Sequence, residues 1–113
     1  MHEYSIVQAL VERVEAEAAL RGAVAVDRVL VRIGELSGVD IELLATAYLT
    51  FRHRTICAHA PLEITPVRPE WRCRACDAHV IGGKTLRCSA CGGPAALRQG
   101  DEIVLERIEM EVG

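Results

Sequence analysis

The chain has 113 residues, of which 50% are hydrophobic but only 4% aromatic, so aliphatic side chains must build its core. Its net charge of -3 argues against nucleic acid as the main partner, because phosphate binding requires clustered Lys and Arg. The N-terminus lacks a basic stretch followed by an apolar run, and no window approaches the ~20 apolar residues that span a membrane. We therefore expect a cytoplasmic protein without a membrane partner, whose five cysteines stay reduced and free to bind metal.

Two amphipathic helices are predicted in the first half of the chain, because apolar side chains recur there at helical spacing. The first stripe consists of Val7, Leu10, Val11, Val14 and Ala18, and the second of Ile41, Leu44, Ala45, Tyr48 and Leu49. We expect Glu3 or Ser5 to cap the first helix and Gly22 to end it, while Asp40 caps the second. A strand over residues 29–33 separates the two helices.

Two further strands are predicted, over residues 62–67 and 103–112. Prolines place the first of them at a sheet edge, since proline cannot donate a ladder hydrogen bond. The order of elements indicates an α+β fold, in which a small antiparallel three-stranded sheet carries two helices on one face. We expect residues 1–68 with 99–113 to form this domain and residues 69–98 to form an inserted zinc-ribbon domain.

Four of the five cysteines form two CxxC pairs that eleven residues separate. They are Cys73, Cys76, Cys88 and Cys91. Each pair can wrap a tight turn with both sulfurs toward one ion, and together they give a tetrahedral thiolate site with no open position, as in structural zinc. Gly82 and Gly83 lie midway and suit a two-residue hairpin turn that brings the pairs together. Cys57 lies outside both pairs and is expected to be a buried apolar residue.

Other roles for the cysteine segment stay open at this point. Four thiolates also suit iron in a rubredoxin-like electron carrier. Residues 69–98 hold five basic and two acidic side chains, a net charge of +3 that suits a nucleic-acid-binding zinc ribbon. A redox dithiol fits less well, because a second CxxC lies at ribbon spacing. Catalysis is not expected, because four thiolates leave the ion no position for water.

The N-terminal Met1-His2-Glu3 offers a second metal site. The Met1 amine and the His2 amide nitrogen would close a five-membered chelate ring, and the His2 amide with its own Nδ1 a six-membered one. Three nitrogens near one plane suit Ni(II) or Cu(II) rather than zinc. Glu3 would add its carboxylate or its amide. The other histidines, His53, His59 and His79, are expected at the surface.

Several of these features together resemble the HypA/HybF hydrogenase nickel-incorporation proteins, over essentially the whole chain. They are Met1-His2-Glu3 followed by a helix, the Arg-Ile-Gly-Glu-Leu-Ser-Gly turn at residues 32–38, the two cysteine pairs, and the closing strand that contains Ile108-Glu109. The resemblance implies a nickel metallochaperone, not an enzyme, for the maturation of [NiFe]-hydrogenase. Some relatives also serve urease.

The resemblance also implies roles for particular residues and partners. His2 matches the family's nickel ligand, with Met1 giving its amine and Glu3 assisting. The residues that match the zinc ligands are Cys73, Cys76, Cys88 and Cys91. The implied partners are a hydrogenase maturation GTPase, the hydrogenase large subunit and, where urease is served, urease maturation proteins.

Overall fold

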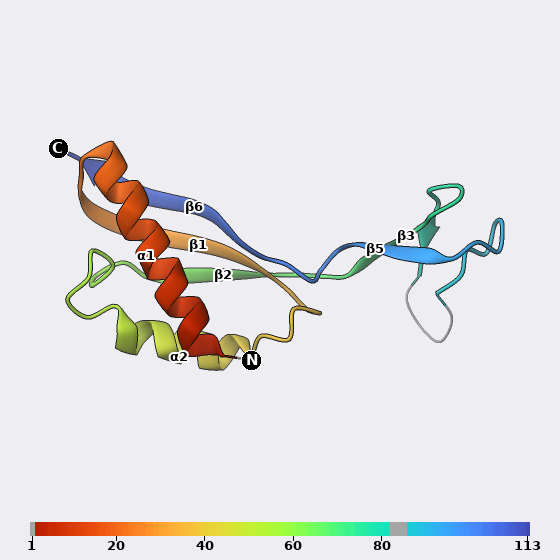
Figure 1. The fold of residues 1–113 in the computed structure, drawn as a ribbon, viewed down its shortest axis with the longest axis horizontal. Coiled ribbons are helices and arrows are strands. Elements are labelled where there is room, and N and C mark those ends of the chain that lie inside the picture. The colour runs from red at the N-terminus through yellow and green to blue at the C-terminus, as the bar shows by residue number, and fades with distance from the viewer. Residues whose placement is uncertain (1, 82–85) are drawn as a thin grey trace.

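The structure is a computed structural model that describes residues 2–81 and 86–113. Along the chain lie α1 (Glu3–Arg21), β1 (Ala23–Gly34), α2 (Ile41–Phe51), β2 (Leu62–Val67), β3 (Glu70–Cys73), β4 (His79–Val80), β5 (Ala95–Gln99) and β6 (Ile103–Val112). The main sheet has the strand order β2-β1-β6, and a second sheet, the ribbon sheet, has the order β4-β3-β5. Figure 1 shows the main sheet with both helices at one end of the molecule and the ribbon sheet at the other.

The molecule is elongated, with extents of 56 × 27 × 16 Å. Its radius of gyration of 17.9 Å exceeds the roughly 13 Å expected of a compact chain of this length. Two separate apolar cores account for this shape. One lies between the helices and the main sheet, and the other lies within the ribbon sheet.

Helix α1 buries four of the five residues of the predicted apolar stripe, while Leu10 is half-buried. The helix ends at Gly22, which adopts the left-handed conformation with φ +67°. The expected start of the helix was wrong. His2 is the cap residue and makes no side-chain capping bond, while Glu3 and Ser5 lie inside the helix. The Glu3 carboxylate is engaged elsewhere, because it accepts a hydrogen bond from the Asp40 amide.

Helix α2 begins as predicted at the Asp40 cap, whose Oδ1 accepts a hydrogen bond of 3.1 Å from the Leu43 amide. Leu44 and Tyr48 are buried, and the Tyr48 hydroxyl donates to a backbone carbonyl 2.7 Å away. Leu49, expected in the same stripe, is exposed instead. Cys57 follows in the loop and is fully buried in this core, as expected.

The main sheet is mixed rather than antiparallel. β6 pairs with β1 antiparallel, but β2 pairs with β1 parallel. The reason is the intervening α2, which returns the chain to the end of the sheet where β1 began, so that β2 runs in the same direction. β2 lies at an edge, as its prolines predict.

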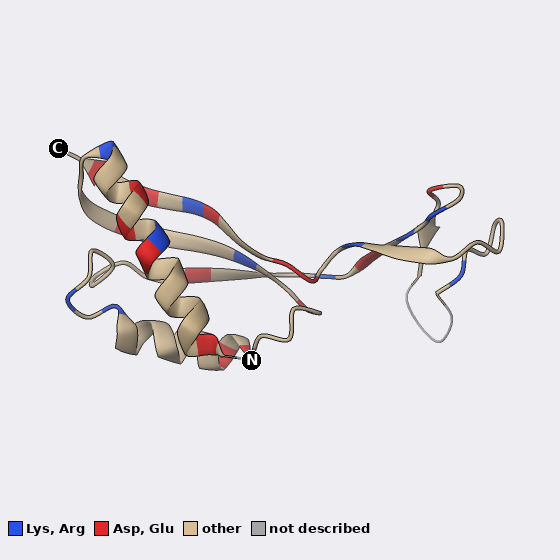
Figure 2. Cartoon of the chain, viewed as in Figure 1, with Lys and Arg blue, Asp and Glu red and all other residues tan. Residues whose placement is uncertain are grey.

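Both helices cover the same face of the main sheet, as expected. Val29, Val31 and Ile33 of β1 point into the core that α1 and α2 line. On the opposite face, Arg28 donates to the Glu109 carboxylate at 3.0 and 2.7 Å and to Glu63 at 2.7 Å. The Arg28 hydrogen bonds lower the pKa of Glu109 to about 2. Figure 2 shows this alternation of basic and acidic residues along the main sheet.

The neck between the two sheets consists of the end of β1 and the connections β2–β3 and β5–β6, whose backbones touch. The Gly34 amide donates to the Glu102 carbonyl at 2.8 Å, and the Leu36 amide donates to the Gly100 carbonyl at 2.7 Å. A Cβ atom at Gly34 would overlap the backbone of Gly100, and one at Gly100 would lie 2.5 Å from the Pro69 Cα. Glycine is therefore required at both positions.

Helix α1 has 19 residues but carries charged side chains along its length. Across residues 2–81 and 86–113, no helix combines the length and the apolar character that crossing a membrane requires.

Candidate metal centres

Two turns at the far end of the ribbon sheet bring four sulfurs together. The first turn, residues 73–77, follows β3, and the second, residues 88–92, precedes β5. The four Sγ atoms lie within 4.8 Å of one another, with Cys73 and Cys91 3.4 Å apart and Cys76 and Cys88 3.6 Å apart. Sulfurs at about 2.3 Å from one tetrahedral ion would lie roughly 3.8 Å apart. The cluster can therefore hold one metal ion.

The two turns have the same backbone geometry. In the first, the Asp77 amide donates to the Cys73 carbonyl at 3.0 Å, and in the second the Gly92 amide donates to the Cys88 carbonyl at 2.8 Å. The residue that closes each turn has a positive φ, +61° at Asp77 and +74° at Gly92. The repeated CxxC pattern is thus a repeated turn, which presents both of its sulfurs on the same side.

Backbone amides point at the first sulfur of each turn. The amides of Ala75 and Cys76 donate to the Cys73 sulfur at 3.3 and 3.5 Å, and the Ala90 amide donates to the Cys88 sulfur at 3.4 Å. The Cys76 amide is the main cause that lowers the pKa of Cys73 to about 6. These amides favour the thiolate form, which is the form that binds metal.

The second sulfur of each turn behaves in the opposite way. The Gly93 amide acts to lower the pKa of Cys91, but hydrogen bonds with the Cys73 and Cys76 sulfurs outweigh it and raise that pKa to about 12. Four thiols at this separation cannot all ionise together, because like charges repel. A divalent cation among them would remove the repulsion, so the site is built for a cation.

The residues around the cluster fit closely. A Cβ atom at Gly93 would lie 3.1 Å from the Cys73 sulfur and 3.3 Å from the Cys91 sulfur, so the backbone of Gly93 passes close to both sulfurs. Trp71 packs against the small ribbon core. Gly82 and Gly83 lie outside the described residues, so the hairpin turn predicted there stays a prediction.

The N-terminal candidate site lies beside α2 in the helix-covered domain, apart from the cysteine cluster in the ribbon (Figure 1). His2 is exposed, and its carbonyl accepts the first helical hydrogen bond of α1, from the Ile6 amide at 3.1 Å. Met1, the source of the amine in the predicted chelate, lies outside the described residues. The structure thus presents the His2 imidazole to solvent at the start of a helix.

Glu3 is the one buried charged residue of the described chain, with 7% of its surface exposed. Its Oε2 accepts a hydrogen bond of 3.0 Å from the Asp40 amide, and this bond lowers the pKa of Glu3. The sequence indicated Asp40 only as a helix cap. Nothing in the sequence links two residues that lie 37 positions apart, and only the packing of α1 beside α2 joins them.

The remaining histidines, His53, His59 and His79, are all exposed, as expected. Within the described residues, the four cysteines form the only group of three or more potential metal-binding side chains. Together, a thiol cluster built for a cation and a small α+β fold define a metal-binding protein with a zinc-ribbon-type module.

Comparison with known proteins identifies the family. The family described as "Hydrogenase/urease nickel incorporation, metallochaperone, hypA" matches residues 1–110. The chain therefore belongs to the HypA family of nickel metallochaperones.

Individual relatives match over nearly their full length. A hydrogenase maturation factor HypA from Wolinella succinogenes is 40% identical over 114 residues, which cover 98% of this chain and 96% of the relative. The solution structure of the Ni metallochaperone HypA from Helicobacter pylori is 32% identical, with a TM-score of 0.75 and full coverage of both chains. A second solution structure of a HypA protein is also 32% identical, with a TM-score of 0.81 and coverage of 100% and 98%.

Proposed function

We propose that this chain binds Ni(II) at its N-terminus and delivers it to the precursor of a nickel enzyme, the large subunit of a [NiFe]-hydrogenase, without catalysis of its own. The observation that carries the proposal is the exposed His2 at the start of α1 in a chain that belongs to a nickel metallochaperone family. Delivery requires a site that binds and then releases its cargo. A chelate at an exposed chain end meets that requirement better than a closed cage.

The start of α1 suits this chelate. The first amides of a helix have no acceptor within the helix, so the backbone nitrogens of His2 and Glu3 are not committed to α1. The ligands would be the Met1 amine together with the His2 amide and imidazole. Glu3 would assist through its amide or the free oxygen of its carboxylate, since Oε2 holds the Asp40 amide. The same bond would fix the chelate beside the start of α2.

The cysteine cluster would hold structural Zn(II). The donor set fits zinc, because four thiolates saturate a tetrahedral ion and leave no position for water. Bound there, zinc would supply the folding energy that the small ribbon core lacks. Metal analysis of the purified protein tests this proposal against the iron electron carrier. About one zinc per chain and no visible thiolate–iron absorption are expected, and iron as the main metal would contradict it.

The wider setting follows from the same proposal. A hydrogenase maturation GTPase would act with this chain in the cytoplasm, and urease maturation proteins would join where urease is also served. Residues 1–68 with 99–113 would form the nickel-binding domain and residues 69–98 the zinc ribbon. In the nucleic-acid alternative, the arginines of the ribbon would bind phosphates. However, Arg72 and Arg98 already pair with Glu70 and Asp77.

A calorimetric nickel titration of the zinc-loaded chain tests the proposed nickel site. The native chain should bind nickel, whereas His2→Ala and a chain with a short N-terminal extension should both bind it much more weakly, with unchanged zinc content. His59→Ala is the matched control, because it removes another exposed imidazole, far along the chain from His2, and should change nothing. Affinity should also fall in acid, since the amine and the imidazole must lose protons to bind. Undiminished binding by the extended chain would overturn the N-terminal chelate.

A further inference from the structure

The ribbon sheet has an apolar face. β3 lies between β4 and β5, and its Trp71 is directly opposite both Val80 and Leu97. Side chains opposite each other on neighbouring strands share a face of the sheet, so these three form an apolar row. Leu86 extends this face beside β5, where its carbonyl accepts a hydrogen bond of 2.9 Å from the Ala95 amide. Ala95 lies two residues before Leu97 and therefore points the same way.

This apolar face of the ribbon is only partly covered. Cys73 and Cys88 are buried on it, but Trp71 and Leu97 are half-buried, and Leu86 keeps 38% of its surface exposed. The two helices of the described chain both pack on the main sheet, and their core shares no residue with the ribbon core. No described helix therefore covers the ribbon, and part of its apolar face is open to another molecule.

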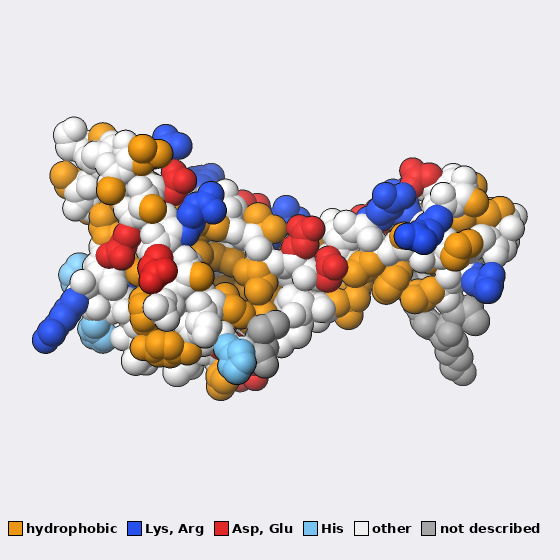
Figure 3. All heavy atoms as spheres, in the orientation of Figure 1, with side chains coloured by type: hydrophobic (Ala, Val, Ile, Leu, Met, Phe, Trp, Pro, Cys, Tyr) orange, Lys and Arg blue, Asp and Glu red, His pale blue; other side chains and the backbone are white. Residues whose placement is uncertain are grey.

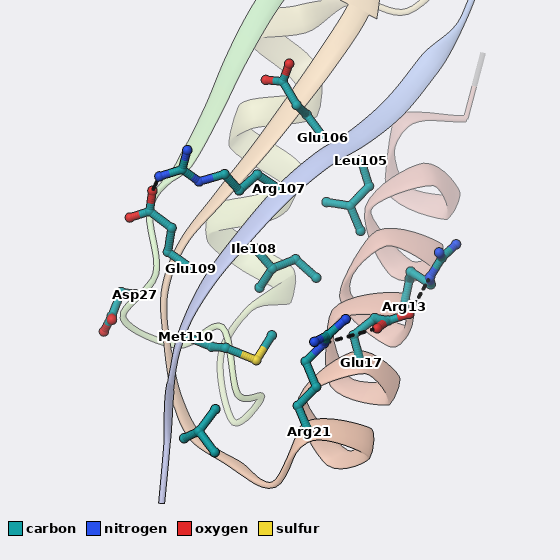
Figure 4. Close-up of a pocket in the computed structure, with 11 residues that line it drawn as sticks. Arg13, Glu17, Arg21, Asp27, Leu105, Glu106, Arg107, Ile108, Glu109 and Met110 are labelled. Atoms are coloured by element: carbon teal, nitrogen blue, oxygen red, sulfur yellow. Dashed lines mark hydrogen bonds and ion pairs between the residues drawn. The ribbon is translucent and has the colours of Figure 1, made fainter.

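The main sheet of the same chain shows what covers such a face. Leu105, Ile108 and Met110 of β6 point toward α1 (Figure 4), and all three pack against the core that the two helices line. A sheet with one apolar face is stabilised when another element packs on that face, and an amphipathic helix supplies the matching apolar stripe. The ribbon has no such helix in the described chain, so a helix of another protein fits this place.

The charge of the ribbon indicates which helix fits. Residues 69–98 carry a net charge of +3, whereas the rest of the chain carries -6. Arg72 and Arg98 pair with carboxylates of the ribbon itself, but Arg74 and Arg87 are exposed and form no ion pair with a described residue. Figure 3 shows basic side chains beside hydrophobic ones on the ribbon. A helix with acidic side chains next to its apolar stripe matches this surface.

We propose that the apolar face of the ribbon docks an amphipathic helix of a partner protein, whose apolar stripe is bordered by Asp and Glu. Trp71, Leu97 and Leu86 would contact the stripe, and Arg74 and Arg87 would pair with the acidic border. An apolar centre with a charged rim is the usual anatomy of a protein interface, and tryptophan often contributes most of the binding energy there. The proposal uses no residue of the N-terminal nickel site and is independent of it.

The emission of Trp71 tests this proposal directly, because it is the only tryptophan and lies in the docking face. The probe is a synthetic helical peptide of Ala, Leu and Glu, without tryptophan, in which Leu forms one stripe and Glu borders it. Added to the zinc-loaded, nickel-free chain, it should shift the emission to shorter wavelength and reach saturation. Salt should weaken the binding. The same peptide with Lys in place of Glu should leave the emission unchanged.

Variants with matched controls locate the binding surface. Leu97→Ser should weaken binding of the peptide about tenfold or more, because serine cannot replace the apolar contact. Leu86→Ser should act in the same direction at a more exposed position, whereas Leu49→Ser, at an exposed leucine of α2, should bind like the wild type. Arg74→Glu should weaken binding several-fold and reduce its dependence on salt. Arg54→Glu changes an exposed arginine after α2 and should have no effect.

Metal analysis and the emission of each peptide-free variant verify that its ribbon is loaded and folded. An unchanged Trp71 emission of the wild type with the Leu/Glu peptide would overturn the proposal, because a peptide bound elsewhere leaves this residue unaffected. Equal binding of the lysine peptide would also overturn it, as would folded Leu97→Ser and Leu86→Ser variants that both bind normally. An emission shift caused by single-stranded oligothymidylate instead of the peptide would assign the surface to nucleic acid and contradict a helical protein partner.

Discussion

The conformation of Gly92 sets a measurable part of the affinity for metal. Its φ is +74°, and a Cβ atom there would meet nothing within 4 Å, so Gly92→Ala adds backbone strain without a clash. An L-residue in the left-handed region costs about 1–2 kcal/mol. Metal binding and folding are coupled in such modules, so the strain appears as weaker metal binding. A loss of this size corresponds to an affinity about 5–30-fold lower.

Competition for zinc against a chromophoric chelator measures this loss. Gly92→Asn should lose less affinity than Gly92→Ala, although asparagine is larger, because asparagine tolerates the left-handed conformation. Gly22→Ala provides the control at the end of α1. That position has a φ of +67° and equally open surroundings, so it carries the same backbone cost in the other core.

The control variant should lower the thermal stability of the helix-covered sheet and leave zinc affinity unchanged. Zinc binding by Gly92→Ala equal to that of the wild type would refute the reasoning, as would an asparagine variant weaker than the alanine one. The second result would mean that side-chain size, rather than backbone conformation, limits this turn.

Variants at three further positions test other contacts. Gly34→Ala should cost about 3 kcal/mol or more of unfolding free energy, measured by denaturant titration, because its Cβ has no space in the neck. The pKa of Glu109 is lowered to about 2, mainly by Arg28, so its stabilisation is present at neutral pH and is lost as pH falls from about 4.5 toward 2. In Glu109→Gln, the melting temperature should fall less over this pH range than in the wild type. An equal fall in both proteins would contradict the pairing. Glu3→Ala should speed hydrogen exchange of the Asp40 amide in metal-free protein, whereas Glu3→Gln, which keeps an acceptor, should preserve most of the protection.

Local patterns in the sequence predicted the parts of this fold that depend on local chemistry. The α1 stripe, the Asp40 cap and the left-handed Gly22 all appear where spacing and residue type place them. The two CxxC pairs also meet, because each pair specifies its own tight turn and the ribbon strands bring the turns together. In these cases the interactions lie within a few residues of each other, so the sequence contains all the information needed.

Features that depend on packing between distant segments escaped prediction. β1 extends back to Ala23, beyond the predicted residues 29–33, because β6 continues to pair with it as far as Val112. The bond between Glu3 and the Asp40 amide requires α1 and α2 to lie side by side. The requirement for glycine at position 34 comes from another strand connection that crosses it. None of these contacts leaves a periodic signal in the chain.

The separation of the two cores leads to a last prediction, that metal loss unfolds the ribbon alone. The core around Cys73 shares no residue with the core beneath the helices. Cys73→Ala leaves three sulfurs, which no longer saturate the ion, so the ribbon should lose its fold while α1 and α2 persist. The single tryptophan, Trp71, packs in the ribbon and reports on it by fluorescence, whereas circular dichroism reports on the helices.

The complementary variant is Cys57→Ala, which removes a sulfur from the core between the helices and the main sheet. It should lower the temperature at which the helical signal melts and leave the tryptophan emission and metal content unchanged, since Cys57 is fully buried far from the cysteine turns. If Cys73→Ala instead abolished the helical signal together with the tryptophan signal, unfolding of the ribbon would spread through the neck to the helix-covered sheet. The two metal centres would then belong to one cooperative unit, and zinc binding would be a condition for a folded nickel site.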